Sequence, residues 1–232
     1  AYEGMEKFFP AEKIIMTGNP VRQNLLGHSI THEEAAKYFG FNPAKKIILI
    51  LGGSLGARTI NQTLTAELET IRKNADIQFI WQTGKIYIEQ VRDAITTITG
   101  EAVHHPHINA IPNLYVTDFI KDMANAYAAA DLVISRAGAG SISEFCLLHK
   151  PVILVPSPNV AEDHQTKNAL ALVDKDAAIY VKDIEAQEKL LSIALETVTD
   201  DDKLKKLSDN IAQLALPDSA TIIAKEVLKL IK

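Results

Sequence analysis

The stretch that decides the fold runs from Leu132 to Glu144 and reads Leu-Val-Ile-Ser-Arg-Ala-Gly-Ala-Gly-Ser-Ile-Ser-Glu. Leu132–Ile134 is typical of a buried strand, and Phe145–Leu148 is typical of a helix. The glycine-rich turn between them brings backbone N–H groups without intrahelical partners to a helix start, which suits a phosphate. Glu144 would place a carboxylate beside the same turn, where it can accept hydrogen bonds from a pair of sugar hydroxyls. A plain strand–helix turn with a solvent-facing Glu144 is the alternative interpretation.

A second unit of the same kind begins at Lys46. The apolar run Lys46–Leu51 is typical of a central parallel strand, and the loop Gly52–Arg58 leads into a helix expected to reach about Lys73. The loop is not GxGxxG, so it lacks the dinucleotide-binding fingerprint. Further strands are expected at 77–81, 114–120, 151–156 and 177–181. Further helices are expected at 31–38, 86–98, 122–130, 163–175, 185–198, 201–214 and 218–231.

This alternation predicts an α/β fold, a Rossmann-like doubly wound parallel sheet of about six strands with helices on both faces. Ligands of such sheets bind outside the carboxyl ends of the strands. Four loops are expected at that edge, and their convergence indicates a binding site: 52–56, 119–123, 136–144 and 156–165.

Composition excludes several classes of protein. The 232 residues are 47% hydrophobic and carry a net charge of −5 without a basic patch, so no nucleic acid is expected as a partner. No apolar run approaches the roughly 20 residues of a membrane span. Cys146, the single cysteine, is expected to be a buried structural thiol in a cytoplasmic protein. The chain starts at Ala1 without methionine, which suggests a fragment or a processed chain.

Two groups of residues are candidate metal ligands. His104, His105 and His107 are close together, but no cysteine or paired carboxylate completes a ligand set, so a solvated loop is the favoured interpretation. The run Asp200–Asp202 lies between two expected helices and is typical of a helix cap or solvated turn. No bound metal and no cofactor are therefore expected.

Five motifs occur together in one order and carry a resemblance. They are Gly18-Asn19-Pro20-Val21-Arg22, Gly52-Gly53-Ser54-Leu55-Gly56-Ala57, Phe119-Ile120-Lys121-Asp122-Met123, Arg136-Ala137-Gly138-Ala139 with Ser143-Glu144, and Asp163-His164-Gln165 with Asn168-Ala169. The set resembles the C-terminal, donor-binding half of the MurG family, the peptidoglycan N-acetylglucosaminyltransferases of glycosyltransferase family 28. The resemblance implies one half of a two-domain GT-B fold, with residues 1–30 as the interdomain linker and the end of the N-terminal domain, and 31–232 as the Rossmann-like domain that binds the UDP-sugar donor.

The resemblance also implies the reaction. N-acetylglucosamine would move from UDP-N-acetylglucosamine to undecaprenyl-diphosphate-muramyl-pentapeptide, lipid I, with inversion, giving lipid II. The N-terminal half of the family would carry the acceptor site, the catalytic base and the membrane contact, so no catalytic residue is expected in this chain. The full-length protein would be peripheral on the cytoplasmic face of the inner membrane.

Donor-binding roles follow from the same resemblance. The Ile120 backbone would read the uracil edge, Arg22 would lie near the nucleotide, Ser54 would donate to a phosphate oxygen, and Gln165 would contact the sugar hydroxyls. The Glu144 carboxylate would accept hydrogen bonds from the ribose hydroxyls. The stretch that contains it would line the donor: Ala139, Gly140, Ser141, Ile142, Ser143 and Glu144. Weaker candidates are Gly53, Met123, Arg136 and Gly138. The family more usually has a larger residue and a threonine at Gly140-Ser141.

Three other functions remain open on the sequence. A UDP-N-acetylglucosamine 2-epimerase would bind the same donor on the same fold, but it needs no lipid acceptor. One subunit of a split transferase would lack catalytic activity alone. A NAD-binding domain is disfavoured because both GxGxxG and the acidic residue about 20 positions later are absent.

Overall fold

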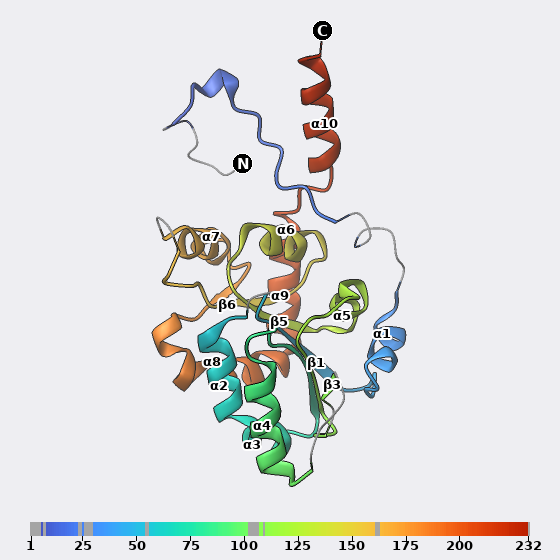
Figure 1. Ribbon diagram of the computed structural model, residues 1–232. Helices are drawn as coiled ribbons and strands as arrows, with labels where there is room; N and C mark the ends of the chain where they lie inside the picture. The colour runs from blue at the N-terminus through green and yellow to red at the C-terminus, as the bar shows by residue number, and fades with distance from the viewer. Residues whose placement is uncertain are drawn as a thin grey trace.

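A single sheet forms the centre of the protein in the computed structural model (Figure 1). The structure describes residues 6, 8–22, 25, 30–53, 56–101, 107–108, 110–160 and 163–231. In these residues the sheet has seven strands, β1 (Lys46–Leu51), β2 (Ile77–Gln82), β3 (His107–Ile108), β4 (Leu114–Thr117), β5 (Leu132–Ser135), β6 (Val152–Leu154) and β7 (Ile179–Tyr180).

The strand order is β3-β4-β2-β1-β5-β6-β7. All neighbouring pairs are parallel except β3 and β4, which are antiparallel. The six parallel strands confirm the predicted doubly wound sheet, and their order is that of dinucleotide-binding folds. The order reverses between β1 and β5, so the chain leaves these two neighbouring strands toward opposite sides. That reversal is where such sheets hold a ligand.

The edge strand β3 corrects the expectation that His107 lies in a solvated loop. Residues 107 and 108 pair with Thr117 and Val116 of β4. Two residues are too few for a hydrophobic period to emerge from the sequence, so only the pairing itself identifies this strand.

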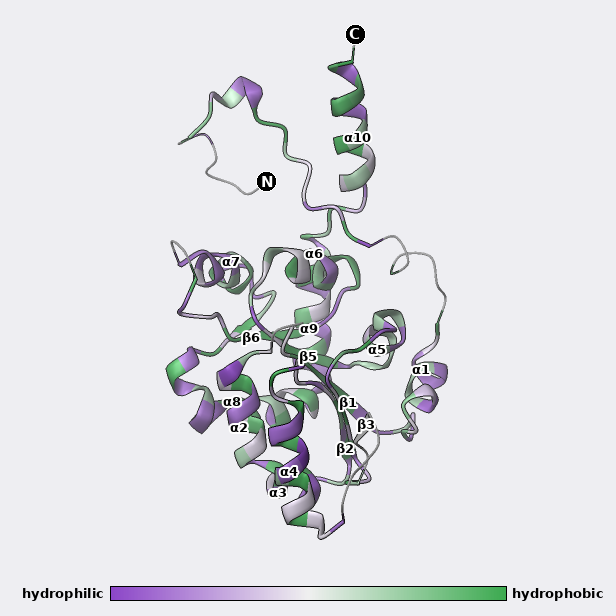
Figure 2. Cartoon of the chain, in the orientation of Figure 1, coloured by the Kyte–Doolittle hydropathy of each residue, from purple (hydrophilic) through white to green (hydrophobic). Residues whose placement is uncertain are grey.

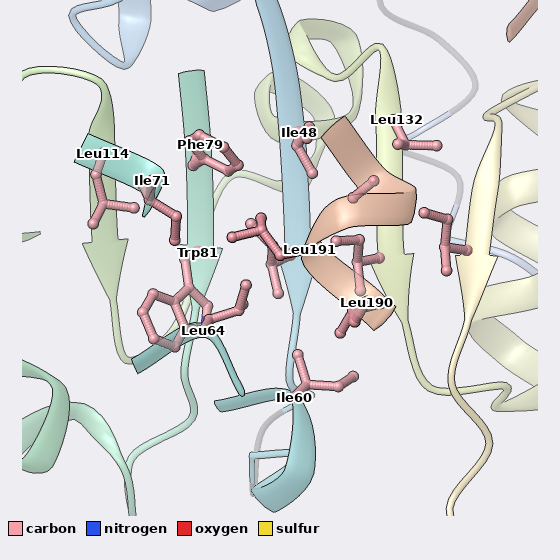
Figure 3. Close-up of a cluster of buried hydrophobic side chains, with 14 of the residues drawn as sticks. Ile48, Ile60, Leu64, Ile71, Phe79, Trp81, Leu114, Leu132, Leu190 and Leu191 are labelled. Carbon is pink, nitrogen blue, oxygen red and sulfur yellow. The ribbon is translucent and has the colours of Figure 1, made fainter. Parts of the chain in front are cut away.

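Alternation along β1 separates two hydrophobic cores. Ile48 and Ile50 face one core, and Ile47, Leu49 and Leu51 face the other. Because both faces are covered, the strand reads as a continuous apolar run, as expected of a buried parallel strand. Figure 3 shows the first core, in which Phe79 and Trp81 of β2 lie among leucine and isoleucine side chains from the covering helices.

Helices cover both faces of the sheet (Figure 1). The first core receives side chains from α2 (Arg58–Ala66), α3 (Leu68–Lys73), α4 (Ile88–Thr99) and α8 (Ala186–Val198). The second receives side chains from α1 (His32–Tyr38), α5 (Met123–Ala129), α6 (Ala139–Leu147) and α7 (His164–Val173). Helix α9 (Asp201–Ala212) contributes Leu204 to the first core and Ile211 to the second.

Local signals placed several helix ends correctly. Thr31 and Glu34 form a capping box at the predicted start of α1, and the Asp200 carboxylate accepts from the Lys203 N–H as the cap of α9. Asp163 does occupy the N-cap position of α7, but it has φ +52° and its carboxylate accepts from the Thr166 hydroxyl instead of a backbone N–H. The Asp163 side chain therefore does not cap a backbone N–H of α7.

Three predicted boundaries are also corrected. The helix expected from 58 to 73 is divided at Glu67 into α2 and α3. Strand β4 ends at Thr117, so Ile120 lies in the following loop and not in the strand. Helix α6 begins at Ala139, so the glycine-rich turn after β5 is shorter than the sequence indicates.

The last helix, α10 (Ser219–Lys229), projects from the body of the domain beside the N-terminal segment (Figure 1). Although α10 projects from the domain, hydrophobic residues occur along it (Figure 2). Leu228, Leu230 and Phe8 expose 64%, 82% and 75% of their surface, respectively. Within the described residues, no helix has the length and apolar character needed to cross a membrane.

Candidate functional site

A cleft of about 370 Å³ opens at the carboxyl ends of β1, β2 and β5, where the strand order reverses. Three of the four predicted loops line it, and none of the described residues of the 156–165 loop does. The lining residues are Arg22, Leu51, Gly52, Gly53, Gln82, Phe119, Ile120, Met123, Tyr127, Ser135, Arg136, Gly138, Gly140, Ser141 and Glu144. The fold thus brings together the segment before the domain and both glycine-rich turns.

The N-terminus of α6 forms one wall of the cleft. Gly138 is its N-cap, and the N–H groups of the first turn have no intrahelical acceptors. The first turn holds no acidic residue. A Cβ atom at Gly140 would meet nothing within 4 Å, and one at Gly138 would meet only the Ser141 hydroxyl at 4.0 Å. This wall therefore combines open space with the positive end of a helix dipole, which is the chemistry of an anion site.

The turn after β1 forms the opposite wall. Gly52 packs closely on the neighbouring strand, because a Cβ there would lie 2.9 Å from the Gln82 carbonyl oxygen. Gly53 has φ +71° and faces open space. Ser54, the predicted phosphate donor, lies outside the described residues. Gly52 and Gly53 line the cleft, whereas Gly56 does not, and the donor-binding role of Gly53 stays a prediction.

Glu144 is the centre of the polar contacts in the cleft. Its carboxylate accepts from Arg22, with Nε at 3.0 Å from Oε1 and a terminal guanidinium nitrogen at 3.1 Å from Oε2. The Tyr127 hydroxyl donates to Oε2 at 2.7 Å. The Glu144 side chain is 13% exposed and that of Arg22 is 50% exposed. Glu144 is thus a sheltered acceptor, contrary to the solvent-facing alternative.

The Gly18–Arg22 segment is attached to α6 at two points. Besides the Arg22–Glu144 pair, the Asn19 amide donates to the Ser143 hydroxyl at 3.1 Å, and that hydroxyl donates to the Ala139 carbonyl. Gly18, with φ +73°, lies against Leu216 and Ser219 at the start of α10. These contacts account for the spacing of the motif, because the turn at Gly18 directs Asn19 and Arg22 onto one helix.

Arg136 lines the cleft but is bound elsewhere. Its guanidinium forms an ion pair with Asp183 and donates to the carbonyls of Val155 and Pro156. These contacts tie β5 to β6 and to the short 3₁₀ helix at Asp183–Glu185. The guanidinium of Arg136, a weaker donor-site candidate, is therefore already paired with a carboxylate.

Ile120 and Met123 lie in the cleft, on the loop after β4 and at the start of α5. The Ile120 N–H donates to Oε1 of Gln82 at 2.8 Å. A base reading this backbone would therefore meet an N–H that already has a side-chain acceptor. The Ile120 side chain is buried in the second core, so it packs in the interior while the backbone is the part that a ligand in the cleft could meet.

Four further predicted donor residues are not among those that line the cleft: Ala139, Ile142, Ser143 and Gln165. Ala139, Ile142 and Ser143 belong to the first turns of α6, and the Ile142 side chain packs in the second core. Gln165 lies in the first turn of α7, where its side-chain oxygen accepts from the Ser157 N–H at 2.9 Å. Gln165 thus braces the loop after β6, and its contact with a sugar stays a prediction.

Sequence reasoning missed Gln82 and Tyr127. Gln82 is the last residue of an apolar strand and pairs in register with Leu51 of β1. Its position beside Gly52 depends on the strand order, which the sequence does not give. Tyr127 is four residues after Met123 and shares its helix face. A search for polar groups one turn beyond the predicted site residues would have found it.

Cys146 is buried and free, as predicted. Burial raises the pKa of its thiol to about 11. We expect no labelling by Ellman's reagent at pH 8 until the protein is unfolded in urea, because the thiolate is the reactive form. Since the folded state keeps the thiol proton to a higher pH than the unfolded state, this group lowers stability as the pH rises above 9. Rapid labelling of the folded protein would contradict this assignment.

No three His, Cys, Asp or Glu side chains gather to form a metal site within the described part of the chain. His104 and His105, and the side chain of His107, lie outside that part.

Comparison with known proteins gives three results. Residues 47–223 match the glycosyltransferase family 28 C-terminal domain. The chain is 72% identical over 230 residues to a Bacteroides fragilis protein named UDP-N-acetylglucosamine--N-acetylmuramyl-(pentapeptide) pyrophosphoryl-undecaprenol N-acetylglucosamine transferase, covering 99% of this chain and 58% of that relative. The chain therefore spans between half and two thirds of the relative's length.

Solved structures are similar as well. The crystal structure of Acinetobacter baumannii MurG is 28% identical with a TM-score of 0.65, covering 84% of this chain and 53% of that one. The UDP-GlcNAc 2-epimerase of Neisseria meningitidis, bound to UDP-GlcNAc, has the same TM-score of 0.65 at 16% identity, over 97% of this chain and 58% of that one. At that identity the second likeness concerns the fold alone.

Proposed function

Because the chain belongs to glycosyltransferase family 28 through its C-terminal domain, we propose that it is the donor-binding part of an inverting GT-B transferase. The donor is UDP-N-acetylglucosamine and the acceptor is lipid I, so the product is the peptidoglycan precursor lipid II. The observation that carries the proposal is that the sheltered Glu144 carboxylate and the N-terminus of α6 line one cleft. A nucleoside diphosphate needs both chemistries, an acceptor for its ribose and a positive dipole for its phosphates.

The donor would lie across the cleft in three parts. Uracil would meet the backbone at Ile120, in competition with Gln82 for the N–H. The ribose hydroxyls would donate to Glu144. The diphosphate would lie at the first turn of α6, where Gly138 and Gly140 leave open space.

In this proposal Arg22 exchanges partners when the donor binds. Its guanidinium donates to both oxygens of Glu144 in the structure. Because its side chain is half exposed, it can turn from the carboxylate toward the diphosphate at modest cost. The positive charge at the phosphates therefore comes from Arg22 and the α6 dipole, while Arg136 stays paired with Asp183.

The chemical step is a direct displacement. The acceptor's 4-hydroxyl oxygen attacks the anomeric carbon, the bond from that carbon to UDP breaks, and the configuration inverts. The hydroxyl proton goes to a base outside this chain. The residues described here orient the donor and stabilise the negative charge that develops on the departing diphosphate.

The acceptor belongs to the part of the protein beyond this chain. Lipid I and the membrane would be met there, and the protein would work at the cytoplasmic face of the inner membrane. The exposed hydrophobic residues of α10 fit a surface that other parts of a longer protein cover.

An epimerase acting on the same donor is the second candidate, favoured by the likeness in fold to the Neisseria enzyme. The name of the 72% identical relative favours the transferase. The products distinguish them, because an epimerase converts UDP-N-acetylglucosamine without any lipid acceptor.

Calorimetric titration of this chain tests the donor site. We expect UDP and UDP-N-acetylglucosamine to bind, because the cleft that we assign to them lies within the chain. NAD should not bind, because the turn after β1 lacks the dinucleotide fingerprint. Binding of NAD without binding of UDP would contradict the proposal.

A further inference from the structure

The Glu144 carboxylate accepts hydrogen bonds from two groups that differ in how deeply they are buried. Arg22 reaches it from the segment before the domain, and Tyr127 reaches it from α5. We propose that Tyr127 is a positioning residue, whose hydroxyl holds the Glu144 carboxylate in the orientation that accepts the ribose hydroxyls. This inference rests on the proposed donor site.

The tyrosine is the fixed partner of the two. Tyr127 is only 2% exposed, and its ring packs edge-on against Phe145 with centroids 6.0 Å apart. Phe145 follows Glu144 in α6, so this packing ties the tyrosine to the helix that carries the carboxylate. Arg22, by contrast, is half exposed and lies outside any helix or strand. Burial fixes where the Tyr127 hydroxyl lies, whereas the guanidinium can move.

Charge gives the hydrogen bond one direction. Burial, and then the neighbouring Glu144 carboxylate, raise the pKa of Tyr127 well above its ordinary value. The phenol therefore stays protonated and acts as a donor to Oε2. A donor at a fixed point leaves the carboxylate little freedom to rotate about its terminal bond.

The remaining acceptor capacity of the carboxylate fits a pair of hydroxyls. An ionised carboxylate has about four acceptor positions. Tyr127 uses one on Oε2, and Arg22 uses one on each oxygen. If Arg22 turns away while Tyr127 stays, each oxygen can accept from one ribose hydroxyl. The tyrosine thus orients the carboxylate, and the arginine covers it until the donor arrives.

Tyr127 also contributes to packing away from the Glu144 carboxylate. It lines a second cavity of about 200 Å³, with Leu25, Ala128 and Lys150 among the other lining residues. A test must therefore remove the hydroxyl and keep the ring. Tyr127→Phe does this.

The experiment compares UDP with 2′,3′-dideoxy-UDP, which lacks both ribose hydroxyls, on the unaltered chain and on Tyr127→Phe. We expect the variant to bind UDP about fivefold more weakly, the equivalent of one hydrogen bond near 1 kcal/mol. Its affinity for the dideoxy nucleotide should stay within about twofold, because that ligand makes no use of Glu144. On a Glu144→Ala background, Tyr127→Phe should have no further effect on UDP binding.

Tyr115→Phe is the matched control, because Tyr115 packs against the same core but does not line the cleft. It should leave both affinities unchanged. Equal weakening of both nucleotides by Tyr127→Phe, or no weakening of UDP, would overturn the positioning role. Failure of the unaltered chain to bind UDP would instead overturn the proposed function, and the inference would fall with it.

Discussion

Glu144→Ala should weaken UDP binding by about tenfold to a hundredfold. The substitution removes the acceptor that we assign to the ribose, and hydrogen bonds to a charged group contribute about 1.5–3 kcal/mol. It also leaves the buried Tyr127 hydroxyl without its acceptor. Calorimetric titration with UDP measures the loss, and 2′,3′-dideoxy-UDP should show little of it.

Glu69→Ala is the control for this loss. Glu69 also pairs with an arginine, Arg72, at 2.9 Å, but both are exposed on α3. Its removal should leave UDP affinity unchanged and alter stability by less than about 1 kcal/mol. If Glu144→Ala bound UDP as tightly as the unaltered chain, Glu144 would have no role in holding the ribose.

Gly56→Ala should destabilise the fold by about 2–5 kcal/mol. Gly56 has φ +87°, and a Cβ there would lie 2.3 Å from the Tyr87 ring and 2.7 Å from the Thr83 carbonyl oxygen. The left-handed conformation costs an L residue about 1–2 kcal/mol, and overpacking adds about 1–3 kcal/mol. Urea unfolding measures the difference in free energy of unfolding.

Gly53→Ala separates the two costs. Gly53 belongs to the same turn and has φ +71°, but a Cβ there would meet nothing within 4 Å. Only the conformational cost of about 1–2 kcal/mol should appear. Equal losses for the two variants would mean that the contacts with Tyr87 and Thr83 relax without penalty.

Much of the sheet could be predicted because its strands are buried on both faces. Runs such as Lys46–Leu51 and Leu132–Ile134 have no polar residue after the first position, and each precedes a glycine turn. Since parallel strands place their carboxyl ends at one edge, most of the predicted loops had to converge. The cleft between β1 and β5 confirms that convergence.

The partners of the site residues could not be predicted, because they depend on strand order and on side-chain geometry. Arg22 and Glu144 are 122 positions apart, and no local pattern links them. The Gln82 contact to Ile120 requires β2 and β4 to be neighbours, a pairing that periodicity does not give. The break at Glu67 likewise has no proline or glycine to mark it.

The most direct test of the account is a crystal structure of this chain with UDP. We predict ribose hydroxyls about 3 Å from the Glu144 carboxylate, as in ordinary hydrogen bonds, and the diphosphate at the first turn of α6. Tyr127 should keep its contact with Oε2, while Arg22 should have left it. A nucleotide bound outside this cleft, or one whose ribose faces away from Glu144, would contradict the central claim.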